Sequence, residues 1–225
     1  MRLVNVCLLT VMITAPAAAA PAEMDKAFAA AFGHAAPFAA TATPDGKKPT
    51  QFTYTPAGLV DVAPGTVALI SKGKSSSDSS AGALAIHYLK RSGGAFTLVK
   101  AWPAIGVTAP NGQVTWTARP DLEGGPAILA SHDEVGSDCK QSYGQLIALT
   151  PDKPVLRVNL LTAVHYDPGP DPDHSPPYQA KAKILPGERG KSFALEYTGT
   201  WKLHVDYQRK GDVFAAKQRE APACQ

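Results

Sequence analysis

The pattern of hydrophobic and polar positions changes near residue 50. Residues 23–36 are rich in alanine and carry Met24, Phe28, Ala31 and Phe32 at helical spacing, which places these apolar side chains on one side. Acidic residues at the beginning of the segment favour the start of a helix. The pattern therefore predicts one short N-terminal helix, followed by a low-complexity linker that ends at residue 50.

From residue 51 onward, apolar side chains recur at every second position in short segments, which is the spacing of half-buried β-strands. The clearest alternating segments are 52–54, 84–88, 114–116, 193–197 and 201–207. The Gly, Pro, Asn and Asp residues between such segments are typical of turns. Short strands separated by turns predict an all-β domain of about nine or ten antiparallel strands.

Three segments share a pattern of strand, turn and apolar residue, and they suggest an internal hairpin repeat: 82–96, 144–156 and 202–214. A true repeat would build stacked sheets or a partial propeller-like array. Any two amphipathic hairpins resemble each other, however, so chance similarity is the alternative. The expected organisation is a signal peptide (1–22), a helix and linker (23–50), a β domain (51–216) and a C-terminal tail (217–225).

The first 22 residues have the pattern of a secretory signal peptide. Arg2 is their only charge, an apolar run follows over residues 3–15, and small residues complete the segment. A membrane-spanning helix needs about 20 apolar residues, so this run is too short for a spanning anchor. We expect cleavage after Ala22, with a cut after Ala19 as the second choice.

Composition narrows the classes of function. The chain has 225 residues, of which 44% are hydrophobic, enough to bury a core. Its 22 basic and 19 acidic residues nearly balance, which argues against nucleic-acid binding because such proteins concentrate basic residues. Without its signal peptide the chain has no apolar stretch long enough to span a membrane. We expect a periplasmic or secreted monomer without a cofactor, whose partner is an envelope protein or a small ligand.

The mature chain would keep two cysteines, Cys139 and Cys224. An even pair in an oxidising compartment predicts a disulfide, which would close a loop over much of the C-terminal half. The alternative is two free thiols, with Cys224 on a frayed tail. Sequence alone does not show that the two Cα atoms come within reach of each other.

Catalytic motifs are sparse. Ser71 begins a Ser-x-x-Lys sequence, the nucleophile motif of penicillin-recognising enzymes, but the partner motifs of those enzymes are missing. Ser71 is therefore also consistent with an ordinary hairpin loop. His87 and His204 occupy the polar positions of alternating strands, so we expect both imidazoles to be solvated.

The segment 132–143 is expected to be a long polar loop, and loops carry function more often than strands do. Its binding candidates are His132, Asp133, Glu134 and Asp138, and the first two are also catalytic candidates. The alternative is a solvent-exposed loop without a role.

A second candidate is the densest anionic stretch of the chain, which contains Asp167, Asp171, Asp173 and His174. Converging carboxylates could bind a divalent cation. The intervening prolines favour an extended connector instead, because they space these side chains along the chain. No metal is assigned.

The complete pattern predicts an exported, non-catalytic binding or interaction module of the cell envelope. Its expected contact surface consists of the segments 72–81, 132–143 and 167–177. One alternative is a small periplasmic hydrolase that combines His132 and Asp133 with a serine of 71–80. A second alternative is an inhibitor of an envelope-attacking enzyme.

Overall fold

The computed structural model describes residues 21–43, 48–76, 81–105, 114–169, 176–218, 221 and 223–224. These residues form thirteen strands and two short helices, so the all-β prediction with one short N-terminal helix is confirmed. Helix α1 spans Pro21–Phe32 and helix α2 spans Pro120–Glu123. Helix α1 thus ends at Phe32, just before Gly33 and four residues earlier than expected.

The strands form two antiparallel sheets in which each strand pairs with the next one along the chain. The first sheet contains β1 (Phe38–Ala42), β2 (Thr50–Ala63), β3 (Thr66–Ser75), β4 (Gly82–Ser92) and β5 (Ala95–Ile105). The second contains β6 (Thr115–Ala118), β7 (Ala127–Val135), β8 (Cys139–Leu149), β9 (Pro154–Tyr166), β10 (Tyr178–Pro186), β11 (Ser192–Gly199), β12 (Leu203–Lys210) and β13 (Val213–Ala216).

The strand count exceeds the nine or ten expected. One addition is β1, which lies in the segment assigned to the linker, where Phe38 to Ala42 pair with Tyr54 to Thr50 of β2. Four of its five residues are alanine or threonine, so the segment has too little apolar alternation to reveal a strand.

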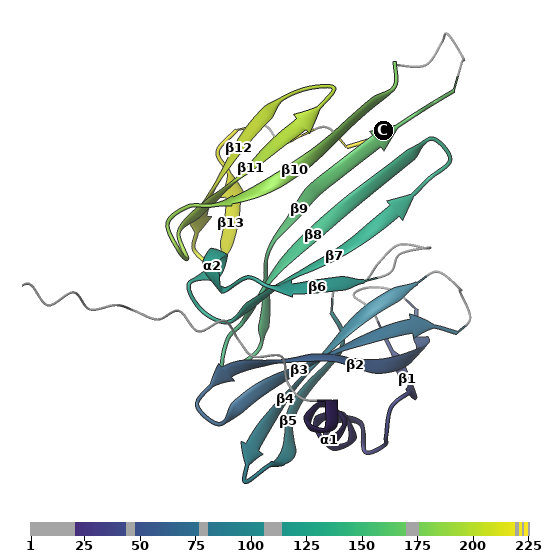
Figure 1. Ribbon diagram of the computed structural model, residues 1–225, viewed down its shortest axis with the longest axis vertical. Helices are drawn as coiled ribbons and strands as arrows, with labels where there is room; N and C mark the ends of the chain where they lie inside the picture. Colours follow the sequence, from purple (N-terminus) through teal and green to yellow (C-terminus); the bar gives the residue numbers. More distant parts are fainter. Residues whose placement is uncertain are drawn as a thin grey trace, which may run out of the picture.

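The two sheets pack against each other through one face of each (Figure 1). The five-stranded sheet contributes Ile70, Leu84 and Ile86 to this shared core, and the eight-stranded sheet contributes Ile128 and Ile147. All five side chains are fully buried. The stacked sheets are therefore held together by continuous apolar contact.

Helix α1 covers the opposite face of the five-stranded sheet (Figure 1). Its Phe28 is fully buried, and the rings of Phe28 and Phe32 stack with centroids 4.4 Å apart. Phe32 also lies 5.3 Å from the ring of Tyr54 on β2. The five-stranded sheet is consequently covered on both faces, by the helix and by the second sheet.

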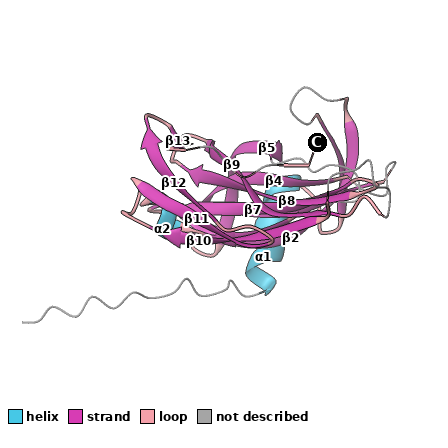
Figure 2. Ribbon diagram, turned by 90° about the horizontal axis from the view of Figure 1, so that it is seen from above, coloured by secondary structure: helices cyan, strands magenta, loops and turns pink. Residues whose placement is uncertain are grey.

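The eight-stranded sheet has a third core of its own, in which Phe193 and Tyr207 stack with centroids 4.9 Å apart. Helix α2 adds Leu122, which is fully buried, to this core. The sheet curls so that β13 returns toward β9, and Arg157 of β9 donates to the carbonyl of Asp212 at 2.7 Å. Figure 2 shows how small a share of the molecule the two helices make up.

The disulfide prediction is confirmed, because the structure joins Cys139 of β8 to Cys224 with a Cα–Cα distance of 6.3 Å. The segment before Cys224 is also attached to the sheet. The Lys217 N–H donates to the carbonyl of Asp206 at 2.8 Å, and the Gln218 amide donates to the carbonyl of His204 at 2.6 Å. None of the helices in the described ranges has the length and hydrophobicity that a membrane crossing requires.

Candidate functional site

The segment 132–143 is a β-hairpin, so its assignment as a long polar loop is wrong. Strand β7 continues to Val135 and β8 begins at Cys139, and the Gly136 N–H donates to the Cys139 carbonyl at 2.7 Å across the turn. Aspartate and glutamate are depleted in strands, and here pairing with the neighbouring strand overrides that preference. The candidate residues are therefore held on a sheet.

Strand alternation separates two of these candidates, since neighbouring side chains point to opposite faces. On one face, the Ser142 hydroxyl donates to the Asp133 carboxylate at 2.6 Å. The Lys140 ammonium lies 3.1 Å from the other carboxylate oxygen. The Ser142 hydrogen bond, followed by the contacts with Lys140, lowers the pKa of Asp133. Asp133 is thus an ionised and weakly basic carboxylate.

On the other face, His132 is buried and its ring stacks on Tyr143 with centroids 5.5 Å apart. Its Nε2 lies 3.7 Å from a carboxylate oxygen of Glu134. The Tyr143 hydroxyl donates to the side-chain oxygen of Gln141, and burial and then the charge of Glu134 raise the pKa of Tyr143. Tyr143 therefore stays protonated at neutral pH and anchors the stacked imidazole.

Lys140 and Ser142 also line a surface hollow of about 470 Å³ that spans β8, β9, β10 and β11. The hollow is within the size range of small-molecule sites. Its polar lining residues are Lys140, Ser142, His165, Gln179, Lys181 and Thr198, and the remaining lining residues are alanine, valine and glycine. Among the described residues that line the hollow there is no carboxylate, so the charged groups among them are basic.

The strand register explains why these side chains share one surface. Lys140 is paired with His165 across β8 and β9, and Ser142 is paired with Ala163. Lys181 of β10 is paired with Ala163 on one side and with Thr198 of β11 on the other. Directly paired residues of antiparallel strands point to the same face. The described residues that line the hollow therefore all come from four consecutive strands.

The structure does not bring Ser71 and His132 together. Ser71 is fully buried on β3 and is paired with Ala85, which belongs to the core beneath helix α1. By alternation, His132 shares the face of β7 that carries Ala130, a residue of the core between the two sheets. The five-stranded sheet thus lies between the serine and the imidazole, which leaves the expected nucleophile without the expected base.

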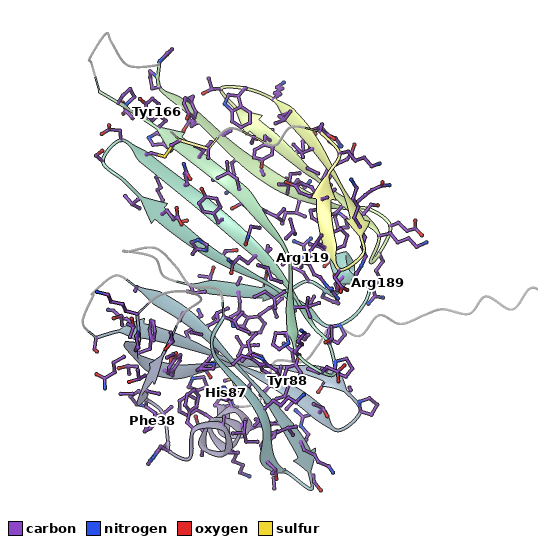
Figure 3. The ribbon with its side chains drawn as sticks, turned by 180° about the vertical axis from the view of Figure 1, so that it is seen from behind. Phe38, His87, Tyr88, Arg119, Tyr166 and Arg189 are labelled. Atoms are coloured by element: carbon purple, nitrogen blue, oxygen red, sulfur yellow. A yellow bond between two sulfur atoms is a disulfide. The ribbon has the colours of Figure 1, made fainter. Side chains whose placement is uncertain are left out.

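His87 is not solvated, contrary to the prediction from its alternating position. Only 3% of its surface is exposed, and it lies on the side of the sheet that faces helix α1 (Figure 3). Its ring centroid is 4.5 Å from that of Phe32 on this helix. Strand β4 is buried on both faces from Gly82 to Leu89. A polar residue in its alternating pattern is therefore not solvent-exposed, because neither face of the strand meets water. Burial lowers the pKa of His87 from 6.5 to about 4.

The proline-rich segment is described only in part. Asp167 lies beside the β7–β8 turn, because its N–H donates to the carbonyl of Asp138 at 2.8 Å, and it precedes the described Gly169. Asp171, Asp173 and His174 lie outside the described residues. Within the described ranges, no group of three or more His, Cys, Asp or Glu side chains is arranged to hold a metal ion.

Two of the three expected contact segments therefore meet, through Asp138 and Asp167. The third, 72–81, begins as the end of strand β3 in the other sheet, and residues 77–80 lie outside the described part.

Sequence reasoning missed Lys140, Ser142, His165 and Lys181 as members of one site. The available signal was the polar alternation of Gln179, Lys181 and Lys183, which marks the outward face of a strand.

Comparison with protein-family models, with curated proteins and with solved structures finds no match for this chain.

Proposed function

We propose that this protein is an exported, non-catalytic binding module of the cell envelope, and that the hollow across β8–β11 is its ligand site. The observation that carries the proposal is the convergence of basic and neutral polar side chains from four neighbouring strands around about 470 Å³. Sites on sheet strands hold their side chains in fixed positions, which favours recognition of a particular ligand.

The chemistry beside the hollow supports binding over catalysis. The Ser142 hydroxyl donates its hydrogen bond to Asp133, whose pKa is lowered. A serine nucleophile needs a nearby base whose pKa is close to the working pH. Asp133 is too weak a base for that role, so Ser142 serves as a hydrogen-bonding group of the site.

The export part of the proposal is supported by two features. The chain begins with the charge, apolar run and small residues of a signal peptide. The Cys139–Cys224 disulfide is the kind of bond that persists in oxidising compartments outside the cytosol.

The test is the native mass of the protein purified from its own compartment without refolding. An Ala163→Trp variant fills the hollow, and an Ala95→Trp variant adds the same side chain at an exposed site on the five-stranded sheet. We expect a bound small molecule in the wild type and in Ala95→Trp, and its loss in Ala163→Trp. Equal ligand content in the two tryptophan variants, or a ligand-free wild type, would contradict the proposed site.

A further inference from the structure

Three basic side chains of the hollow come from three adjacent strands. Lys140 of β8 is directly paired with His165 of β9. His165 is paired with Gln179 of β10, and Lys181 lies two residues further along that strand. Cross-strand diagonal neighbours of this kind are about 7–8 Å apart at their Cα atoms, within reach of long side chains. The three side chains can therefore converge on one bound group.

The charges of this cluster are only partly balanced. Asp133 pairs with Lys140, but neither His165 nor Lys181 forms an ion pair with another residue of the described part. Lys183, two positions further along β10, is instead paired in register with Glu196 of β11. Like charges close together on neighbouring strands are unfavourable. A bound anion would remove the repulsion between positive charges at Lys181. It would change little at Lys183, because Glu196 is already paired in register with that residue.

We propose that the ligand of the hollow carries an anionic group, a phosphate or a carboxylate, that binds between Lys140, His165 and Lys181. The inference rests on the proposed function of the hollow and specifies its ligand class. Ammonium and imidazole N–H groups form strong, charge-assisted hydrogen bonds with such oxygens. The small Ala163 and Gly199 leave room for the rest of the molecule.

Asp133 has a defined part in this arrangement. Its carboxylate accepts the Ser142 hydroxyl at 2.6 Å and holds Lys140 at 3.1 Å, so it already engages one of the three groups that would bind the anion. The ligand's anionic group must compete with Asp133 for Lys140. Removing the charge of Asp133 should therefore strengthen anion binding, although the same change removes two native contacts.

The experiment is a titration of the full mature protein with inorganic phosphate, and separately with acetate, followed by amide and imidazole NMR signals. We expect saturable shifts at His165, Lys181 and Thr198 with the anion whose group the site prefers. Lys181→Gln should weaken binding about tenfold, the loss of one hydrogen bond to a charged group. Asp133→Asn should strengthen it several-fold, and the matched control Lys183→Gln should leave it unchanged.

The results separate this inference from the proposed function. It is overturned if neither anion gives saturable shifts at the hollow, if Lys181→Gln and Lys183→Gln weaken binding equally, or if Asp133→Asn weakens binding. A co-purified ligand that is lost in Ala163→Trp but is uncharged would overturn the anionic class and leave the binding site in place. Equal ligand content in Ala163→Trp and Ala95→Trp would show that the hollow is not the ligand site, and would overturn both the proposed function and the anionic ligand class.

Discussion

The Nε of Arg157 lies 2.9 Å from a carboxylate oxygen of Glu123, and the two side chains are only 6% and 7% exposed. The same oxygen accepts a hydrogen bond from Arg209 at 2.9 Å. Glu123 ends helix α2, Arg157 lies on β9 and Arg209 on β12. A four-residue helix has little stability of its own. This carboxylate therefore fixes α2 to the curled sheet.

Replacing this buried carboxylate should be costly. In Glu123→Gln the two guanidinium groups lose their shared counter-charge, and we expect the free energy of unfolding to fall by about 3–5 kcal/mol. The control is Glu188→Gln, because Glu188 forms an exposed pair with Lys191 and should contribute less than about 1 kcal/mol. Urea denaturation of both variants measures the difference. Equal losses would show that the buried network does not fix α2.

Stability should fall in acid because of His87. Its pKa is about 4 in the folded protein and 6.5 in the unfolded chain, so below pH 6.5 the unfolded state binds more protons. The stability that neutral His87 confers is complete above pH 6.5 and is lost as the pH falls toward 4. The full loss is about 3 kcal/mol.

Urea midpoints between pH 7 and pH 4 test this assignment. His87→Leu should flatten the pH dependence, whereas His204→Leu, at an exposed site, should preserve it. A steep dependence that survives His87→Leu would assign the effect to other groups.

The disulfide should contribute strongly to stability, since its cysteines are 85 positions apart. In the chain-entropy model, closing a loop of that length contributes about 4–5 kcal/mol. A Cys139→Ser/Cys224→Ser double variant should lose a free energy of this size in reversible unfolding. Thiol titration of the denatured wild type should find neither Cys139 nor Cys224 reactive. Two reactive thiols would contradict the bond.

Strands could be predicted from the sequence where one face of the sheet is buried and the other is solvated, because apolar and polar side chains then alternate. Leu195 and Val205 lie on such strands, and both are fully buried in the structure. His87 was misassigned because β4 is covered on both faces, which only the stacking of the layers determines. The short strand β1 was missed because alanine and threonine give little alternation.

The candidate site was predictable only in part. The segment with His132 and Asp133 was expected to be a loop, whereas it is a hairpin whose strand alternation points the two side chains to opposite faces. The hollow depends on how β8, β9 and β10 align. A register shift between Ser142 and Tyr143 changes which residues of β9 face Lys140. Register follows the apolar pattern and the turns, and nothing in that pattern marks the irregularity between Ser142 and Tyr143.

The most direct test of the ligand site is an amide NMR spectrum of the mature protein, recorded before and after adding the protein-free small-molecule fraction of its own compartment. We expect shifts concentrated at residues 140–142, 163–165, 179–181 and 198–199, the segments that line the hollow. These shifts should be absent in Ala163→Trp. An unchanged spectrum, or shifts confined to the five-stranded sheet, would contradict the account.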